Sequence, residues 1–190
     1  GGEVEYLCAG PRERIAYHPK AVKAAIVTSG GLCPGMNNLI REIYTMLRTY
    51  GCDEVYGVRF GFRGFYKNDF PPIRLTDDFV DQVHHKGGSV LGASRHVTDT
   101  LATADAIERG GFTHIYFIGS DLAQVIASKL LVEIRRRKLK VALCGIPKTV
   151  DNDLAIVDKS FGGETAVENA IKAVKSARVE AKSAINGIGL

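Results

Sequence analysis

The sequence predicts an α/β fold in which helices cover both faces of a mostly parallel sheet. Short apolar segments alternate with longer amphipathic ones along the chain. The short segments are apolar throughout, as strands buried on both faces of a sheet are. Glycines separate many of these segments and mark the turns between them. The 190 residues suffice for one domain with a hydrophobic core.

The first half of the chain contains two predicted strands and two predicted helices. Residues 24–28, Ala-Ala-Ile-Val-Thr, predict the first strand, and residues 37–50 predict an amphipathic helix after it. Residues 54–58 predict a second strand. A short helix is expected at 77–85.

The second half continues the alternation. A helix over 101–109 is expected to end at Gly110-Gly111. The remaining predicted elements are a strand at 114–118, a helix at 122–137, a buried strand at 140–144 and a long helix at 165–182. In the last helix, Val167, Ile171 and Val174 recur at helical spacing and predict its core-facing side.

The expected domain organisation is simple. Residues 1–20, which include Pro11 and Pro19, predict an irregular arm, and residues 21–190 a single lobe. Residues 186–190 resemble a turn and the first residue of another strand. We therefore expect the chain to be part of a longer protein.

The composition is compatible with an anionic small-molecule partner but does not require one, and the cysteines favour a cytoplasmic protein. The formal net charge is +4, from 25 basic and 21 acidic residues. The basic cluster at 135–138 favours a solvated helix end, not a nucleic-acid site. The cysteines and histidines lack metal-binding spacing, which predicts reduced thiols. No apolar stretch approaches about 18 residues, and no signal peptide is evident, so no membrane partner is expected.

The segment 145–153, Gly-Ile-Pro-Lys-Thr-Val-Asp-Asn-Asp, follows the predicted strand at 140–144. Pro147 excludes a helix, so these side chains are predicted on a loop at the carboxyl end of the strand, where open α/β sheets bind ligands. Two carboxylates beside Lys148 suit phosphoryl transfer, because one can accept a hydroxyl proton and the other can help to hold Mg²⁺. A polar turn that caps local backbone groups is the alternative.

Three further loops carry residues suited to chemistry. The glycine-rich segment 28–37 lies between a strand and a helix, which suits phosphate binding or a plain turn. It matches neither the Walker A nor the GxGxxG pattern. Arg95 ends a second glycine-rich segment and either clamps a phosphate or lies on the surface. Asp121 follows the strand at 114–118 and either coordinates Mg²⁺ or caps the next helix.

Together these loops resemble the N-terminal lobe of the 6-phosphofructokinase family, in its plant-like ATP-dependent form. The matching segments are TSGGLCPGMN at 28–37, GFRGFY at 61–66, GGSVLGASR at 87–95, the strand and loop at 114–124, GIPKTVDND at 145–153 and VDKSFGGETAVENA at 157–170. They cover nearly the whole chain in the family's order. The resemblance implies a Rossmann-like three-layer lobe.

The resemblance also implies how the sugar would bind. Asp151 matches the catalytic general base that deprotonates the 1-hydroxyl of fructose 6-phosphate. Thr149 and Val150 lie in the segment that contacts this substrate. Asp153 matches a second carboxylate near the Mg²⁺ ion.

On the nucleotide side, Gly31 matches the glycine whose backbone meets the phosphates of ATP. Arg95 and His96 match a pair that contacts ATP. Asp121 matches the aspartate associated with Mg²⁺. ATP is therefore the implied co-substrate and Mg²⁺ the implied metal.

One loop departs from the family pattern. Where the family has Gly-Gly-Asp-Gly-Thr, this chain has Gly119, Ser120, Asp121, Leu122 and Ala123. With a positive φ, Leu122 would cost about 1–2 kcal/mol. Its isobutyl group is also expected to project toward the phosphates. We therefore expect weak ATP binding.

Three functions remain open. The leading prediction is the nucleotide-side lobe of a glycolytic 6-phosphofructokinase, expected to assemble as a homo-oligomer in its full-length form. A non-catalytic or regulatory subunit is the second, and a pyrophosphate-dependent enzyme is the third. Because further sugar contacts would come from parts beyond Leu190, the isolated chain is expected to show no turnover.

Overall fold

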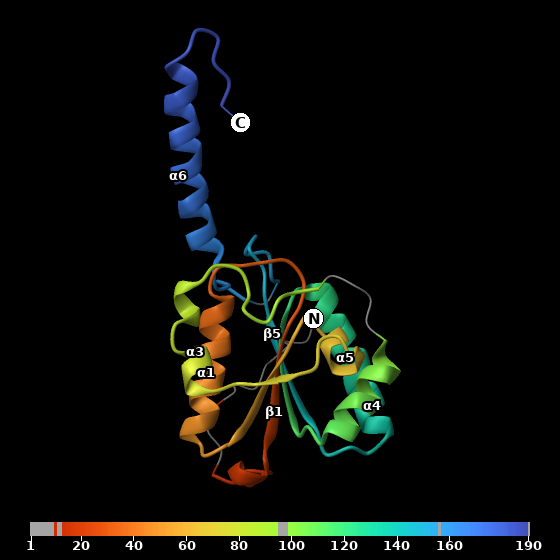
Figure 1. The fold of residues 1–190 in the computed structure, drawn as a ribbon. Coiled ribbons are helices and arrows are strands. Elements are labelled where there is room, and N and C mark those ends of the chain that lie inside the picture. Colours follow the sequence, from red (N-terminus) through yellow and green to blue (C-terminus); the bar gives the residue numbers. More distant parts are fainter. Residues whose placement is uncertain (1–9, 11–12, 95–98, 156, 190) are drawn as a thin grey trace.

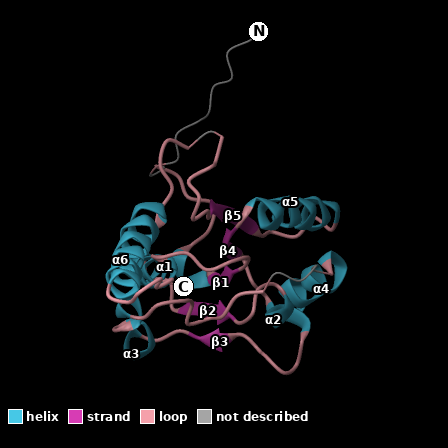
Figure 2. Ribbon diagram, turned by 90° about the horizontal axis from the view of Figure 1, so that it is seen from above, coloured by secondary structure: helices cyan, strands magenta, loops and turns pink. Residues whose placement is uncertain are grey.

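The computed structural model describes residues 10, 13–94, 99–155 and 157–189. A five-stranded sheet lies between two groups of helices (Figures 1 and 2). The strand order is β3-β2-β1-β4-β5, with β3 antiparallel to β2 and the other neighbours parallel. The predicted three-layer α/β fold with a mostly parallel sheet is confirmed.

The strands are β1 (Lys23–Thr28), β2 (Glu54–Val58), β3 (Ile73–Arg74), β4 (His114–Gly119) and β5 (Ala142–Pro147). The helices are α1 (Met36–Thr49), α2 (Arg63–Tyr66), α3 (Asp77–Val80), α4 (Thr100–Gly110), α5 (Asp121–Arg136) and α6 (Gly163–Lys182). Short 3₁₀ turns occur at Pro19–Ala21 and Val83–His85. The sequence did not predict α2 or β3.

Strand β1 shows why the sheet needs helices on both faces. Ala25 and Val27 belong to the core cluster formed with α4 and α5, whereas Ala24 and Ile26 belong to the cluster formed with α1. All four side chains are fully buried. Because successive side chains of a strand point to opposite faces, one apolar strand fills both cores.

The predicted helix at 77–85 is wrong as a single element. Thr76 caps α3 by accepting a hydrogen bond from the amide of Phe79, and this helix ends at Val80. The 3₁₀ turn at Val83–His85 follows. Between them Gln82, with φ −109° and ψ 7°, leaves the helical region.

Strand β5 corrects two expectations. It runs from Ala142 to Pro147, so its last three residues, predicted as loop, belong to the strand. Within the described residues it pairs only with β4, and much of it is exposed, so its predicted burial is also wrong. An edge strand has one neighbour, and Pro147 is tolerated at such a strand's end.

Helix α6 corrects a third expectation. It projects away from the sheet and the other helices (Figure 1). The exposed fractions of Val167, Ile171 and Val174 are 58%, 48% and 67%, so the predicted core-facing side of α6 is solvent-exposed in this chain. The stripe has helical spacing, but no other helix or strand in the described part of the chain covers it.

The predicted arm at 1–20 is only partly visible. Residues 1–9 and 11–12 lie outside the described residues, and residues 13–18 form no helix or strand. Tyr17 anchors this segment, because its ring lies edge-on to His114 of β4 with centroids 4.6 Å apart. The boundary between arm and lobe stays a prediction.

Candidate functional site

Three loops begin at adjacent positions on the carboxyl edge of the sheet. Thr28, the last residue of β1, is in register with Ile118 of β4, and Gly119 of β4 is in register with Pro147 of β5. The loops after β1, β4 and β5 therefore start side by side. In open α/β sheets this edge is where ligands bind.

The loop after β1 is held by the segment that ends at Ser94. The hydroxyl of Ser29 and the amide of Gly30 both donate to the carbonyl of Ser94, at 2.9 and 3.1 Å. Gly30 has φ +86°, which suits glycine. Gly35, with φ +92°, stands at the start of α1 without a side-chain cap, an arrangement that suits an anion.

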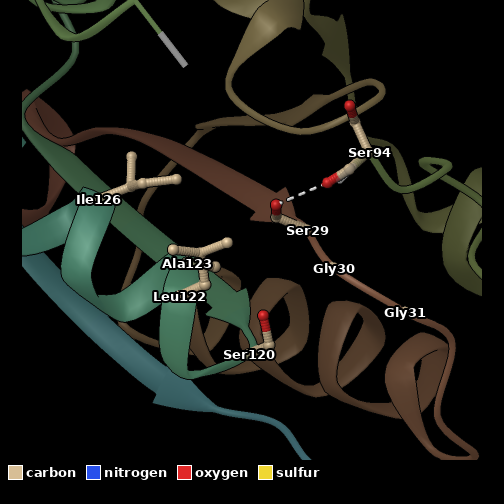
Figure 3. Close-up of a pocket in the computed structure, with 8 residues that line it drawn as sticks. All are labelled: Ser29, Gly30, Gly31, Ser94, Ser120, Leu122, Ala123 and Ile126. Atoms are coloured by element: carbon tan, nitrogen blue, oxygen red, sulfur yellow. Dashed lines mark hydrogen bonds between the residues drawn. The ribbon is translucent and has the colours of Figure 1, made fainter. Parts of the chain in front are cut away.

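A pocket of about 290 Å³ separates this loop from the first turns of α5. Figure 3 shows its lining: Ser29, Gly30, Gly31, Ser94, Ser120, Leu122, Ala123 and Ile126. Ser120 stands opposite Gly30, where a Cβ would lie 3.0 Å from the Ser120 hydroxyl oxygen. Serine hydroxyls and glycine amides supply polar groups on one side, and aliphatic side chains supply the other.

Leu122 lines this pocket without backbone strain. The non-glycine residues with positive φ in the described part of the chain are Phe60, Lys138, Asn152 and Asn186. Leu122 instead lies in the first turn of α5 with 68% of its surface exposed. Leu122 therefore has no backbone strain. Its apolar side chain in the pocket is the one remaining reason to expect weak ATP binding.

Asp121 does not cap α5. The cap position belongs to Ser120, and Asp121 is the first helical residue. The capping alternative is therefore wrong. Its exposed carboxylate stands at the helix N-terminus, where the helix dipole stabilises a negative charge.

The loop after β5 is ordered by its own side chains. The hydroxyl of Thr149 donates to a carboxylate oxygen of Asp153 at 2.6 Å and accepts from the amide of Asp151 at 3.1 Å. Asn152, between the two aspartates, has φ +54°. These bonds leave the Asp151 carboxylate on an exposed turn.

Two residues from outside this loop also hold it. Ser160 donates through its hydroxyl to the carbonyl of Thr149 at 3.1 Å, and through its amide to the side-chain oxygen of Asn152 at 2.6 Å. The thiol of Cys33 donates to the carbonyls of Thr149 and Phe161, at 3.7 and 3.3 Å. Burial raises the pKa of Cys33, and the nearby Lys148 ammonium opposes this rise.

A second pocket, of about 580 Å³, lies beside Asp151. It extends from Val150, Asp151 and Asn152 to the first turns of α6. Lys159 lines it and pairs with Glu164 at 2.7 Å. The pocket places Asp151 beside an open space of mixed polar and aliphatic lining that is large enough for a small substrate.

The carboxylates could supply only part of the coordination shell of a Mg²⁺ ion. The described residues contain no group of three or more His, Cys, Asp or Glu side chains that could hold a metal. Asp153 already accepts the Thr149 hydroxyl, whereas Asp121 is exposed. Mg²⁺ often takes only one or two protein carboxylates and completes its shell with water and substrate phosphates. Asp121 and Asp153 are both exposed, and either could supply one carboxylate to such a shell.

Most of the predicted site residues in the described part of the chain lie around the two pockets. Gly31, Ser120, Leu122 and Ala123 line the first, and Val150 and Asp151 line the second. Thr149 is bonded to Asp151 and Asp153 within the same loop, but Asp121 and Asp153 are not among the residues that line either pocket. Arg95 and His96 lie outside the described residues.

Sequence reasoning missed the supporting residues Ser160 and Cys33. Both lie within the segments that carry the resemblance, which was the available signal. Their partners are main-chain carbonyls of distant segments, and spacing along the chain does not reveal these contacts.

Comparison with known proteins adds independent findings. A family model described as phosphofructokinase matches residues 23–189. The chain is 50% identical to ATP-dependent 6-phosphofructokinase 2 of Arabidopsis thaliana, covering 98% of this chain and 42% of that protein. It is 49% identical to ATP-dependent 6-phosphofructokinase of Borreliella burgdorferi, covering 96% and 41%. The chain thus spans about two fifths of these relatives.

Solved structures agree on the fold. A pyrophosphate-dependent phosphofructokinase from Marinobacter aquaeolei matches with a TM-score of 0.74 and 22% identity, over 85% of this chain and 42% of that one. Phosphofructokinase from Pichia pastoris matches with a TM-score of 0.74 and 24% identity, over 82% and 18%. At these identities the likeness concerns the fold alone. Among the described residues, no helix has the length and apolarity needed to cross a membrane.

Proposed function

The chain belongs to the phosphofructokinase family, and we propose that it forms the N-terminal catalytic lobe of an ATP-dependent 6-phosphofructokinase. The enzyme would transfer the γ-phosphoryl group of ATP to the 1-hydroxyl of fructose 6-phosphate, giving fructose 1,6-bisphosphate and ADP. The observation that carries the proposal is the exposed Asp151 carboxylate, held on an ordered turn beside a pocket. Identity of about half to enzymes named ATP-dependent supports ATP as the donor.

In this proposal each loop has one task. Asp151 accepts the proton of the 1-hydroxyl as its oxygen attacks the γ-phosphorus, while Thr149 and Val150 contact the sugar. The glycine-rich loop, with Gly31, meets the phosphates of ATP through backbone amides. Arg95, His96 and the start of α5, from Ser120 to Ala123, would bind the nucleotide. When bound through Asp121 and Asp153, Mg²⁺ would neutralise phosphate charge.

The replacement Asp151→Asn tests the proposed base. In the full-length protein we expect kcat to fall on the order of 10²–10⁴-fold, because a general base contributes about that much. The melting temperature should change little, because the side chain is exposed and Thr149 contacts only the amide of this residue. An unchanged kcat in a coupled assay for fructose 1,6-bisphosphate would contradict the assignment.

A second candidate is a non-catalytic member of the family that binds the sugar but not the nucleotide. Leu122 in the first pocket favours it. Thermal-shift measurements with ATP–Mg²⁺, pyrophosphate–Mg²⁺ and fructose 6-phosphate distinguish the candidates, because a ligand of the folded state raises its melting temperature. A shift with ATP–Mg²⁺ supports the kinase, whereas a shift with the sugar alone supports the non-catalytic protein.

The proposal extends to the biological setting. The proposed reaction is a glycolytic one, and we propose that it takes place in the cytoplasm; two Arabidopsis relatives are named chloroplastic. The complete protein is proposed to be a homo-oligomer. The chain of 190 residues alone is proposed to be inactive, because it spans two fifths of its relatives; robust turnover by it would refute this.

A further inference from the structure

The carbonyl of Thr149 is the meeting point of three segments of the chain. It accepts the Ser160 hydroxyl at 3.1 Å and the Cys33 thiol at 3.7 Å. Ser160 precedes α6, and Cys33 belongs to the glycine-rich loop after β1. The loop that carries Asp151 is therefore tied to both neighbours through one main-chain oxygen.

Ser160 also holds the other side of Asp151. Its amide donates to the side-chain oxygen of Asn152 at 2.6 Å. Asn152 has φ +54°, a conformation that asparagine tolerates better than most residues. Residues 149 and 152 are thus bonded to the same serine, and the Val150–Asp151 segment lies between two fixed points.

Cys33 supplies the link to the glycine-rich loop. Its side chain is 3% exposed, and burial raises the pKa of the thiol, which keeps it protonated and able to donate. The same thiol donates to the carbonyl of Phe161 at 3.3 Å. A Cβ on Gly162 would lie 2.5 Å from the Cys33 sulfur and 2.3 Å from the carbonyl oxygen of Pro34. The junction is therefore closely packed.

We propose that Ser160 and Cys33 are positioning residues, which set the place of Asp151 relative to the glycine-rich loop by holding the carbonyl of Thr149. The inference rests on the proposed function, since it assigns these residues an effect on the attack of the sugar hydroxyl. Displacing a reacting group by about 1 Å can cost 100-fold in rate. Hydrogen bonds that fix Asp151 therefore bear on kcat. Loss of the Ser160 hydroxyl, which lies outside the glycine-rich loop, should leave nucleotide binding unchanged.

The first test compares Ser160→Ala with Ser160→Thr in the longest expressed form of the protein. The alanine variant should lower kcat on the order of tenfold or more, with the KM for the phosphoryl donor unchanged. The threonine variant, which keeps the hydroxyl, should recover most of the rate. Wild-type kcat in Ser160→Ala would overturn the proposal, as would equal loss in both variants.

The second test replaces Cys33 by alanine and by serine, with Cys52→Ala as the matched control. Cys52 is also 3% exposed but lies in the core cluster beneath α1. We expect kcat to fall in Cys33→Ala, to recover in Cys33→Ser and to stay at the wild-type value in Cys52→Ala. Because Ser160 and Cys33 donate to one oxygen, their double alanine variant should be non-additive. Additive losses would overturn the shared role.

A third measurement separates this inference from the proposed function. If the wild-type protein makes no fructose 1,6-bisphosphate with any donor, the proposed function fails. The hydrogen-exchange rate of the Asp151 amide still tests the positioning. It should rise in Ser160→Ala and return in Ser160→Thr, and an unchanged rate would overturn the inference.

Discussion

Leu122 shows how one side chain can change a pocket without disturbing the fold. Its backbone is helical, so it fits the first turn of α5 at no conformational cost. Its exposed isobutyl group lines the space beside the glycine-rich loop. An aliphatic surface offers no hydrogen bond to a phosphate oxygen, and each polar group left unpaired there lowers affinity.

Restoring the residues of the family pattern at these positions should therefore raise affinity for ATP. In the longest expressed form of the protein, Ser120→Gly, Leu122→Gly and Ala123→Thr together should tighten binding on the order of tenfold, the equivalent of about 1.4 kcal/mol. Isothermal titration with ATP–Mg²⁺ measures it. Val132→Ala removes an exposed aliphatic side chain of α5 that is not among the residues lining the pocket, and should have no effect. Equal titration curves for the triple variant and the wild type would contradict the prediction that these residues weaken ATP binding.

At the residue scale, the sequence predicts roles for Asp151 and Asp153 but does not predict which residues hold their loop. Asp151 and Asp153 stand out because carboxylates cluster after a predicted strand. Ser160 and Cys33 act through contacts with main-chain carbonyls that are 11 and 116 residues away along the chain. Such contacts depend on the path of the backbone in the folded protein. The residues next to Ser160 or Cys33 in the sequence do not show which carbonyl each side chain will meet.

At the scale of the element, periodicity located strands and helices better than it predicted their burial. The strand predicted at 140–144 and the last helix both exist, shifted by a few residues. Both are more exposed than predicted. Hydrophobic spacing specifies which side chains share a face, but it does not specify which element covers that face.

Helices α4 and α5 are joined by an ion-pair network that sequence reasoning treated as a solvated helix end. Glu133 accepts two hydrogen bonds from Arg136, at 2.8 and 2.7 Å, and one from Arg137 at 2.6 Å. Arg137 also pairs with Asp105 of α4. Hydrogen bonds from the two guanidinium groups lower the pKa of Glu133 from 4.5 to about 2.

This pKa makes a prediction about acid stability. Because the folded-state pKa lies below the unfolded value, the contribution of Glu133 is fully present above about pH 4.5 and is lost as the pH falls toward 2. Glu133→Gln should therefore lower the urea midpoint at pH 7, and its difference from wild type should shrink between pH 4.5 and 2. Glu42→Gln, at an exposed pair, is the control and should shift the midpoint little. A difference for Glu133→Gln that is constant with pH would contradict the prediction.

At the scale of the whole molecule, the chain consists of a packed sandwich and one projecting helix. Helices α1 and α3 lie on one face of the sheet and α2, α4 and α5 on the other (Figure 2). Each group packs on the sheet through one core cluster. In α6, Gly163 is the one buried residue. Since helices draw most of their stability from tertiary packing, α6 should open more readily than the sandwich.

Limited proteolysis should detect this difference. Trypsin should cut first within α6, at Lys172, Lys175 or Arg178, and leave a persistent fragment containing all five strands. Lys129, in the packed helix α5, is the internal reference for slow cleavage. Mass spectrometry of the early products identifies the first cleavage sites. Cleavage at Lys129 as fast as in α6 would show that the helix is not the weak element.

Gly162 has a mechanical consequence. This residue lies against Pro34 and Cys33 of the glycine-rich loop and is followed at once by a helix of 20 residues. Such a helix is about 30 Å long. A rotation of about 10° at Gly162 would therefore displace the far end of α6 by about 5 Å. Because α6 projects beyond the rest of the fold, any small change of orientation at Gly162, beside the glycine-rich loop, would be multiplied along the helix as far as Lys182.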